Sequence, residues 1–250
     1  MSAGADAGSG KTMRPNITTV KDADALARQA ASFLIEVLAP GSGKRSVCLS
    51  GGSTPKRLYE LLATPPFRDK LPWDRIHWFW GDERFVPPDD PESNYGMTRR
   101  AMLAAVPAPP NHVHPIPTTG MDPGAAAAAY ERTLQAYYGS ATLDPATPLF
   151  DVTLLGLGED GHTASLFPGI AALGERARWA AAIVGAKPEP RISLTLPALD
   201  ASRHVVFLVA GAAKYPVLQR LDQGEDLPAG RVRPTGTLHW MQDESAGTGH

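Results

Sequence analysis

The sequence predicts an α/β fold in which one domain holds a mostly parallel open sheet with helices on both faces, as in Rossmann-like proteins. Two observations lead to this prediction. Short apolar runs alternate with segments of helical period along the 250 residues of the chain. Four polar clusters also fall next to apolar runs, where the carboxyl ends of parallel strands expose a ligand crevice.

The composition limits the kinds of partner. Lys and Arg total 24 against 26 Asp and Glu, a net charge of -2, so no overall field attracts nucleic acid or an anionic membrane. Cys48 is the single cysteine, which excludes an intrachain disulfide and fits a reducing compartment. No segment approaches the roughly 20 apolar residues of a membrane span. We therefore expect a cytoplasmic protein without nucleic-acid or membrane partners. We also expect a monomer or weak homo-oligomer, independently of the composition.

The two ends of the chain are small and polar. Residues 1–13 predict a disordered tail, and residues 244–250 predict a second, flexible one. We expect residues 14–243 to form the single domain. It begins with a short strand at 17–20 and a helix that continues to Leu38.

A glycine-rich loop follows the next apolar run, residues 46–49, and leads to Pro55, which suits the first turn of a helix. Glycines let backbone amides approach an anion, hydroxyl groups add donors, and a helix N-terminus contributes partial positive charge. The loop therefore predicts a phosphate site. Its residues are Gly51, Gly52, Ser53 and Thr54.

A charged cluster ends the apolar run at 76–80 and contains Asp82, Glu83 and Arg84. For one such cluster, a salt-bridged surface turn is the commoner explanation. A helix is predicted over 95–106, with a cap at Ser93 or Asn94.

His112 and His114 alternate with Val113, which favours an edge strand over a metal site because a third ligand is missing. Residues 124–138 have Ala, Leu and Tyr at helical spacing, so a surface helix is predicted there.

The central stretch of the chain is the apolar run 150–157, which breaks at Gly158 into a turn that carries Asp160 and His162. Taken alone, His162 could cap a turn. The other polar clusters are expected at the same edge of the sheet, which favours a role in a site over a role as a cap. Because an imidazole can exchange a proton near neutral pH, His162 is a candidate general base.

The last third of the chain predicts strands at 179–184, 191–196, 205–210 and 238–240. Arg191 stands at the entrance of one strand. Lys214 falls in the predicted first turn of a helix, where a cation opposes the helix dipole and so indicates a nearby anion. Together the clusters suit a small phosphorylated metabolite acted on by general acid–base chemistry.

Five segments resemble the 6-phosphogluconolactonase family, in order, between about Ile17 and Trp240. They are LSGGSTP at 49–55, WGDERFVP at 80–87, SNY at 93–95, GLGEDGHTASLFPG at 156–169 and RISLT at 191–195. The resemblance implies hydrolysis of 6-phospho-D-glucono-1,5-lactone to 6-phosphogluconate, in the oxidative branch of the pentose phosphate pathway. No metal and no organic cofactor is implied, because lactone hydrolysis needs neither redox chemistry nor a carbanion sink.

The resemblance also implies roles for the site residues. His162 would activate a water for attack on the lactone carbonyl, and Asp160 would orient His162 or the water, although one residue separates the two. Arg84 could stabilise the developing oxyanion, while Asp82 would contact sugar hydroxyls or position Arg84. The phosphate would be held by Gly51, Gly52, Ser53, Thr54, Arg191 and Lys214.

Two alternatives follow from the same resemblance. The wider superfamily includes glucosamine-6-phosphate deaminase, whose pattern has a glutamate five residues after the histidine, where this chain has Phe167. The deaminase also tends to have Tyr where this chain has Arg84. A non-catalytic sugar-phosphate sensor ranks third, because no basic helix-turn-helix segment is present. The lactonase is therefore the predicted activity.

Overall fold

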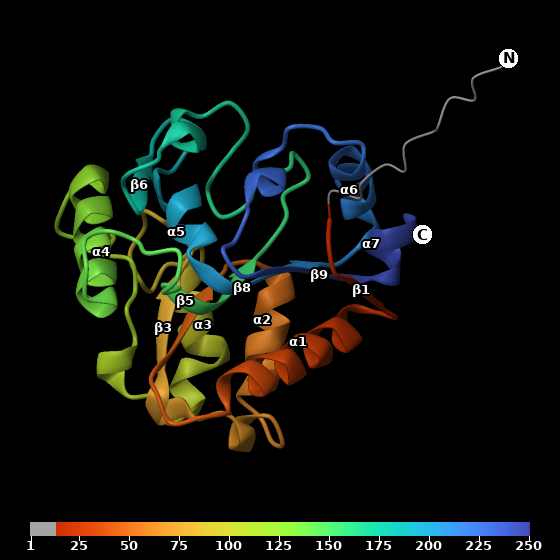
Figure 1. The fold of residues 1–250 in the computed structure, drawn as a ribbon, viewed down its shortest axis with the longest axis horizontal. Coiled ribbons are helices and arrows are strands. Elements are labelled where there is room, and N and C mark those ends of the chain that lie inside the picture. Colours follow the sequence, from red (N-terminus) through yellow and green to blue (C-terminus); the bar gives the residue numbers. More distant parts are fainter. Residues whose placement is uncertain (1–13) are drawn as a thin grey trace, which may run out of the picture.

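The computed structural model describes residues 14–250, so the predicted disordered tail at 1–13 lies outside the described residues. Its main layer is a six-stranded sheet in the order β1-β9-β8-β5-β2-β3, in which every pairing is parallel (Figure 1). This confirms the predicted sheet. The strands are β1 (Ile17–Val20), β2 (Arg45–Leu49), β3 (Ile76–Trp80), β5 (Phe150–Leu155), β8 (Ser202–Val209) and β9 (Thr237–Asp243).

The strand register brings the carboxyl ends together. Leu49 of β2 lies opposite Trp80 of β3, and Leu155 of β5 lies opposite Phe207 of β8. Because all six strands run the same way, the loops that follow β2, β3, β5 and β8 emerge at one edge of the sheet.

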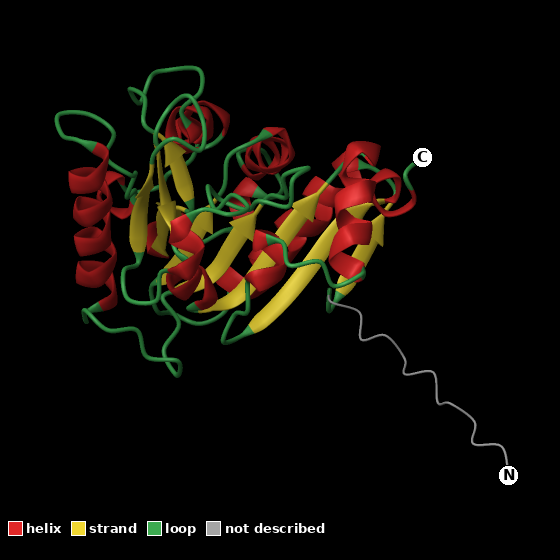
Figure 2. Cartoon of the chain, turned by 90° about the horizontal axis from the view of Figure 1, so that it is seen from above, coloured by secondary structure: helices red, strands yellow, loops and turns green. Residues whose placement is uncertain are grey.

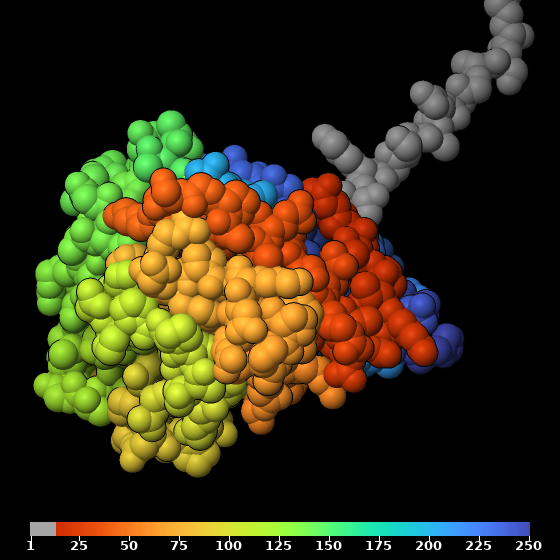
Figure 3. All heavy atoms as spheres, turned by 90° about the horizontal axis from the view of Figure 1, so that it is seen from below, coloured from red at the N-terminus to blue at the C-terminus, as the bar shows by residue number. Residues whose placement is uncertain are grey.

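Helices cover both faces of this sheet, as the view from above shows (Figure 2). The helices α1, α2 and α3 gather on the face drawn in Figure 3. The others are α4, which packs on β6 and β7, and the shorter α5, α6 and α7. Their bounds are α1 (Ala23–Leu38), α2 (Ser53–Leu62), α3 (Asn94–Ala101), α4 (Pro123–Tyr138), α5 (Leu196–Asp200), α6 (Tyr215–Asp222) and α7 (Glu244–Thr248).

A second, antiparallel sheet was not predicted. Its order is β4-β7-β6, with bounds β4 (Asp82–Arg84), β7 (Arg191–Leu194) and β6 (Ala180–Ile183). Only Gly81 separates β4 from β3, so the charged cluster forms a short strand, and the alternative of a salt-bridged surface turn is wrong. The register places Arg84 directly opposite Arg191.

The end of the chain also differs from the prediction. In place of a flexible tail from residue 244, Glu244–Thr248 form α7. The Asp243 side chain accepts a hydrogen bond from the Ala246 N–H at 2.8 Å, and Ala246 is buried. The N-cap and the packing of α7 against α6, β9 and β1 account for this ordered end of the chain.

The expected edge strand around His112 and His114 is reduced to one bridge between Val113 and Trp78. His77 joins the two histidines, stacking on His112 with ring centroids 3.9 Å apart, and its Nδ1 lies 3.0 Å from His114 Nε2. Within residues 14–250 no group of three or more His, Cys, Asp or Glu side chains is arranged to hold a metal ion. The stacked His77 and His112 rings do not direct their nitrogen lone pairs to one point, as metal ligands would have to.

Candidate active site

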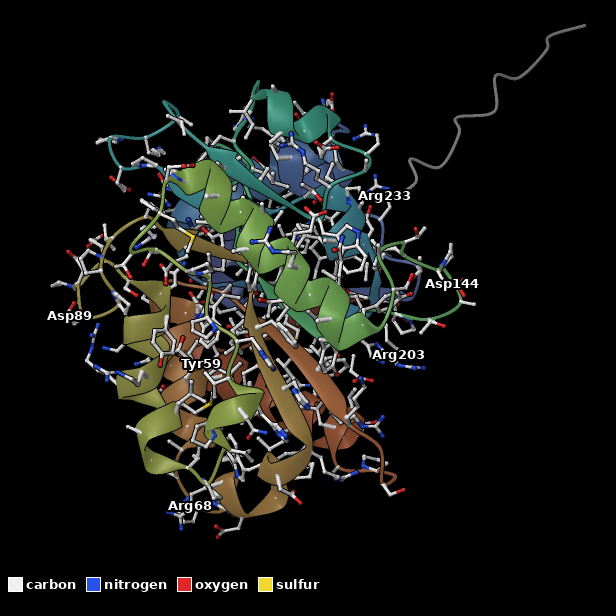
Figure 4. All side chains as sticks on the ribbon, turned by 90° about the vertical axis from the view of Figure 1, so that its left-hand side faces the viewer. Tyr59, Arg68, Asp89, Asp144, Arg203 and Arg233 are labelled. Atoms are coloured by element: carbon white, nitrogen blue, oxygen red, sulfur yellow. The ribbon has the colours of Figure 1, made fainter. Side chains whose placement is uncertain are left out.

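The loop after β2 has the geometry of an anion site. Gly52 adopts φ +105° and precedes α2. No side chain among residues 14–250 caps that helix, so its first N–H groups are available to a ligand. The Tyr59 hydroxyl accepts from the Ser50 N–H at 3.0 Å and donates to the Ser50 carbonyl at 2.8 Å. Tyr59 is fully buried (Figure 4), so it fixes the base of the loop.

The turn after β5 holds the predicted acid and imidazole in contact. His162 Nδ1 lies 2.5 Å from Asp160 Oδ1, and the same oxygen accepts the His162 N–H at 3.0 Å. Gly161 has φ +86°, and a Cβ there would lie 2.8 Å from Leu227, so both the turn and its packing require glycine. The sequence left the Asp160–His162 bond open, and the structure contains it.

This contact determines the chemistry that His162 offers. An ionised carboxylate only accepts hydrogen bonds, so Nδ1 carries the proton and Nε2 keeps a lone pair. Partial burial acts to raise the pKa of Asp160, but hydrogen bonds from the His162 backbone and ring hold that pKa below its usual range. The ionised acid therefore orients the ring.

A cavity of about 260 Å³ collects the predicted residues at the carboxyl edge of the parallel sheet. Every predicted site residue lines it except Asp160, which contacts the His162 ring. The predicted residues in its wall are Gly51, Gly52, Ser53, Thr54, Asp82, Arg84, His162, Arg191 and Lys214.

Two arginines face each other across β4 and β7. Arg84 Nη1 donates to the Glu92 carbonyl at 2.6 Å, and Arg191 Nη2 donates to Glu189 Oε1 at 2.6 Å. The Nε atoms of both arginines are buried and have no hydrogen-bond partner in the described part of the chain. Both guanidinium groups line the cavity, and a guanidinium can donate two hydrogen bonds to one anion, so this wall of the cavity is suited to an anion.

Lys214 adds a third cation. It is the N-cap residue of α6 rather than a residue of the first turn, and it ends a short 3₁₀ turn over Ala212–Lys214. No ion pair with Lys214 occurs among residues 14–250.

Asp82 is buried and held from two sides. Its Oδ2 accepts from the Ser165 hydroxyl at 2.6 Å, and its backbone carbonyl accepts from Asn94 Nδ2 at 2.9 Å. In the described residues no hydrogen bond joins Asp82 to Arg84. The two residues therefore face the cavity independently.

Glu83 is not part of a surface ion pair, since its exposed fraction is 2%. Its carboxylate accepts from the backbone N–H groups of Arg84 at 2.8 Å, Asn94 at 2.7 Å and Tyr95 at 2.8 Å, and from the Ser93 hydroxyl at 3.1 Å. Burial raises the pKa of Glu83, and the backbone hydrogen bonds oppose that rise. Glu83 thus joins the start of α3 to β4.

The sequence matches the family described as glucosamine-6-phosphate isomerases/6-phosphogluconolactonase over residues 21–240. This match spans most of the chain. The chain belongs to this family.

Members of the family resemble the chain along most of its length. A 6-phosphogluconolactonase from Nostoc sp. is 42% identical over 94% of this chain and 98% of its own length. A 6-phosphogluconolactonase from Synechocystis sp. is 45% identical over 82% of this chain and 84% of its own length. A solved 6-phosphogluconolactonase from Thermotoga maritima superposes with a TM-score of 0.79 at 30% identity, covering 92% of this chain and 99% of that one.

Phe167, five residues after His162, packs against the imidazole. Its ring centroid lies 4.7 Å from that of His162, with Lys187 Nζ 5.0 Å and Arg191 Cζ 5.7 Å from the Phe167 ring. Its exposed fraction is 5%. The neighbour of the imidazole is therefore an apolar ring under two cations.

Sequence reasoning missed three residues around Asp82, namely Glu83, Asn94 and Ser165. From the sequence, Asn94 stands out only as a possible helix cap, and Glu83 and Ser165 have no assigned function. The available signals were the Ser93-Asn94 pair at the start of a helix and the two family-like segments that contain Glu83 and Ser165. No helix in residues 14–250 has the length and apolar character needed to cross a membrane.

Proposed function

We propose that the chain hydrolyses 6-phospho-D-glucono-1,5-lactone to 6-phosphogluconate, as a cytoplasmic enzyme of the oxidative branch of the pentose phosphate pathway. The observation that carries the proposal is the oriented Asp160–His162 pair at a cavity that also holds the glycine-rich loop and cations. Relatives named 6-phosphogluconolactonase, 42% and 45% identical to the chain, support the same substrate.

The proposed reaction begins with a water beside His162. Nε2 accepts a proton from the water while the water oxygen attacks C1 of the lactone, and Asp160 stabilises the resulting imidazolium. Arg84 stabilises the oxyanion. The bond between C1 and the ring oxygen then breaks, and His162 returns its proton to that oxygen, which becomes a hydroxyl group of the acid.

Phosphate recognition is assigned to the glycine-rich loop and to two cations of the cavity wall. The backbone of Gly51 and Gly52, the hydroxyls of Ser53 and Thr54, and the unshielded start of α2 supply donors. The cations there are Arg191 and Lys214. A guanidinium can grip two phosphate oxygens at once, so Arg191 is the principal anchor in this proposal.

Phe167 favours the lactonase over the deaminase, because an apolar ring beside His162 cannot supply the carboxylate that the deaminase pattern carries. The Asp160–His162 contact favours catalysis over a sensor, because simple binding does not require an oriented base. The small-molecule substrate requires no nucleic-acid or membrane partner, and we expect a monomer or weak homo-oligomer.

The direct experiment measures hydrolysis of freshly generated 6-phosphogluconolactone against its spontaneous rate, with glucosamine 6-phosphate in parallel. We expect acceleration with the lactone alone. Ammonia release from the amino sugar would instead support the deaminase. Binding of sugar phosphates without turnover of either compound would support the sensor.

A further inference from the structure

Asn94 is a cavity-lining residue with no role in the proposed mechanism. It is the first residue of α3, and its exposed fraction is 3%. Its backbone N–H donates to Glu83 Oε1 at 2.7 Å, and its Nδ2 donates to the Asp82 carbonyl at 2.9 Å. Both ends of the residue are therefore fixed before a ligand binds.

The hydrogen bond to Asp82 also determines the orientation of the carboxamide. A backbone carbonyl only accepts, so the group that faces it must be the NH₂ group. Within residues 14–250, Asn94 Oδ1 has no hydrogen-bond donor, and it is not among the fully enclosed unpaired atoms. The free end of the carboxamide is thus an acceptor.

Gly51 shows where this acceptor lies. A Cβ atom at position 51 would fall 1.9 Å from Asn94 Oδ1, so the oxygen is packed against the backbone of the phosphate loop. Only glycine permits such an approach. Both residues line the same cavity, so Oδ1 lies at the junction of the phosphate loop and Asp82.

An acceptor at this place suits a hydroxyl group rather than a phosphate, whose ionised oxygens are themselves acceptors. We propose that Asn94 is a substrate-contacting residue whose Oδ1 accepts a hydrogen bond from a hydroxyl of the sugar, with Glu83 as its positioning residue. The inference rests on the proposed function and deepens it, because the site then selects a polyhydroxylated phosphate ester over phosphate alone.

Binding measurements test this assignment without relying on turnover. Calorimetry compares 6-phosphogluconate and inorganic phosphate on the wild type, on Asn94→Ala and on Asn111→Ala, which alters an exposed asparagine outside the cavity wall. We expect Asn94→Ala to weaken 6-phosphogluconate binding roughly tenfold, the effect of one lost hydrogen bond. Inorganic phosphate should bind all three proteins within about twofold, a change below that of one hydrogen bond.

A series of monodeoxy 6-phosphogluconates distinguishes a hydrogen bond to Asn94 from a general change in the shape of the cavity. Removal of the recognised hydroxyl should weaken binding to the wild type roughly tenfold and to Asn94→Ala hardly at all, because the partner is already gone. Equal losses in both proteins would overturn the assignment, as would unchanged 6-phosphogluconate binding or a parallel loss of phosphate binding in the variant.

The same series keeps the inference testable if Asn94→Ala does not fold. Wild-type protein that binds every monodeoxy compound as tightly as 6-phosphogluconate would then overturn it. A wild type that binds 6-phosphogluconate but does not hydrolyse the lactone would contradict the proposed function while leaving these binding comparisons valid.

Discussion

Asp160 Oδ1 accepts hydrogen bonds from both the ring and the backbone of His162, at 2.5 Å from Nδ1 and 3.0 Å from the N–H. One carboxylate oxygen therefore fixes the ring orientation and the tautomer together. The residue between them is Gly161, whose φ of +86° folds the chain back on itself. This turn makes a bond possible between residues only two positions apart.

Replacement of this carboxylate should lower turnover without weakening binding. In Asp160→Asn the amide can donate as well as accept, so it no longer requires the proton of His162 to be on Nδ1. The tautomer with the proton on Nε2, which cannot act as the base, becomes populated. We expect kcat to fall roughly 10- to 100-fold with KM nearly unchanged, as for loss of part of a general-base system. Initial rates on the lactone measure this. Glu159→Gln, next to it and exposed, should behave as wild type, and full activity of Asp160→Asn would refute an orienting role.

Arg191 should affect substrate binding more than turnover. In Arg191→Ala the guanidinium opposite Arg84 is lost, and we expect KM to rise roughly 10- to 100-fold with kcat within a few-fold. Arg203→Ala, an exposed arginine away from the cavity (Figure 4), is the control. A KM equal to that of the wild type would remove Arg191 from the phosphate site.

Glu83 should be required for stability. Glu83→Ala leaves the backbone N–H groups of Asn94 and Tyr95 buried without their acceptor, so we expect the free energy of unfolding to fall by roughly 2–4 kcal/mol. Urea denaturation gives the value. Glu92→Ala, an exposed neighbour, should change it by less than about 0.5 kcal/mol. An equally small effect at Glu83 would mean that water replaces the carboxylate.

Asp200 gives a pH dependence of stability with a defined sign. Burial raises the pKa of Asp200 to about 6 from its ordinary 3.8, although the Arg233 N–H donates to its Oδ1 at 2.7 Å. The folded chain holds this proton more tightly than the unfolded chain does. The stabilisation that Asp200 adds to the free energy of unfolding is therefore fully present below pH 3.8, and it is lost as the pH rises toward about 6.

Asp200→Asn removes this titration and can keep the hydrogen bond from Arg233. The difference in unfolding free energy between variant and wild type should therefore grow from about pH 4 to pH 6 and then level off in favour of the variant. Denaturation across this pH range measures it, with the exposed Asp144→Asn as control (Figure 4). A difference that stays constant with pH would show that Asp200 titrates normally.

The parallel sheet and the cavity edge could be predicted from the sequence because both depend on local signals. The apolar runs that end at Leu49 and Leu157 precede polar turns, and parallel strands bring such turns to one edge. The small sheet could not be predicted in this way. Asp82–Arg84 is a three-residue polar strand, and its partner lies more than a hundred residues further along the chain.

Charge was misleading at Glu83 for a related reason. Glutamate is almost never fully buried unless it is paired, so a surface position is the natural expectation. Here its partners are three backbone N–H groups and one hydroxyl, supplied by Ser93, Asn94 and Tyr95 at the start of α3 and by Arg84 beside it. The local sequence pattern does not show that the start of α3 will lie against β4.

The central claim is that His162 is the general base of lactone hydrolysis, and His162→Ala tests it most directly. The measurement is kcat on freshly generated lactone above the spontaneous rate, with calorimetric binding of 6-phosphogluconate on the same protein and His239→Ala, outside the cavity wall, as control. We expect kcat to fall roughly 10²- to 10⁴-fold while 6-phosphogluconate still binds. Hydrolysis at the wild-type rate by His162→Ala would contradict the account.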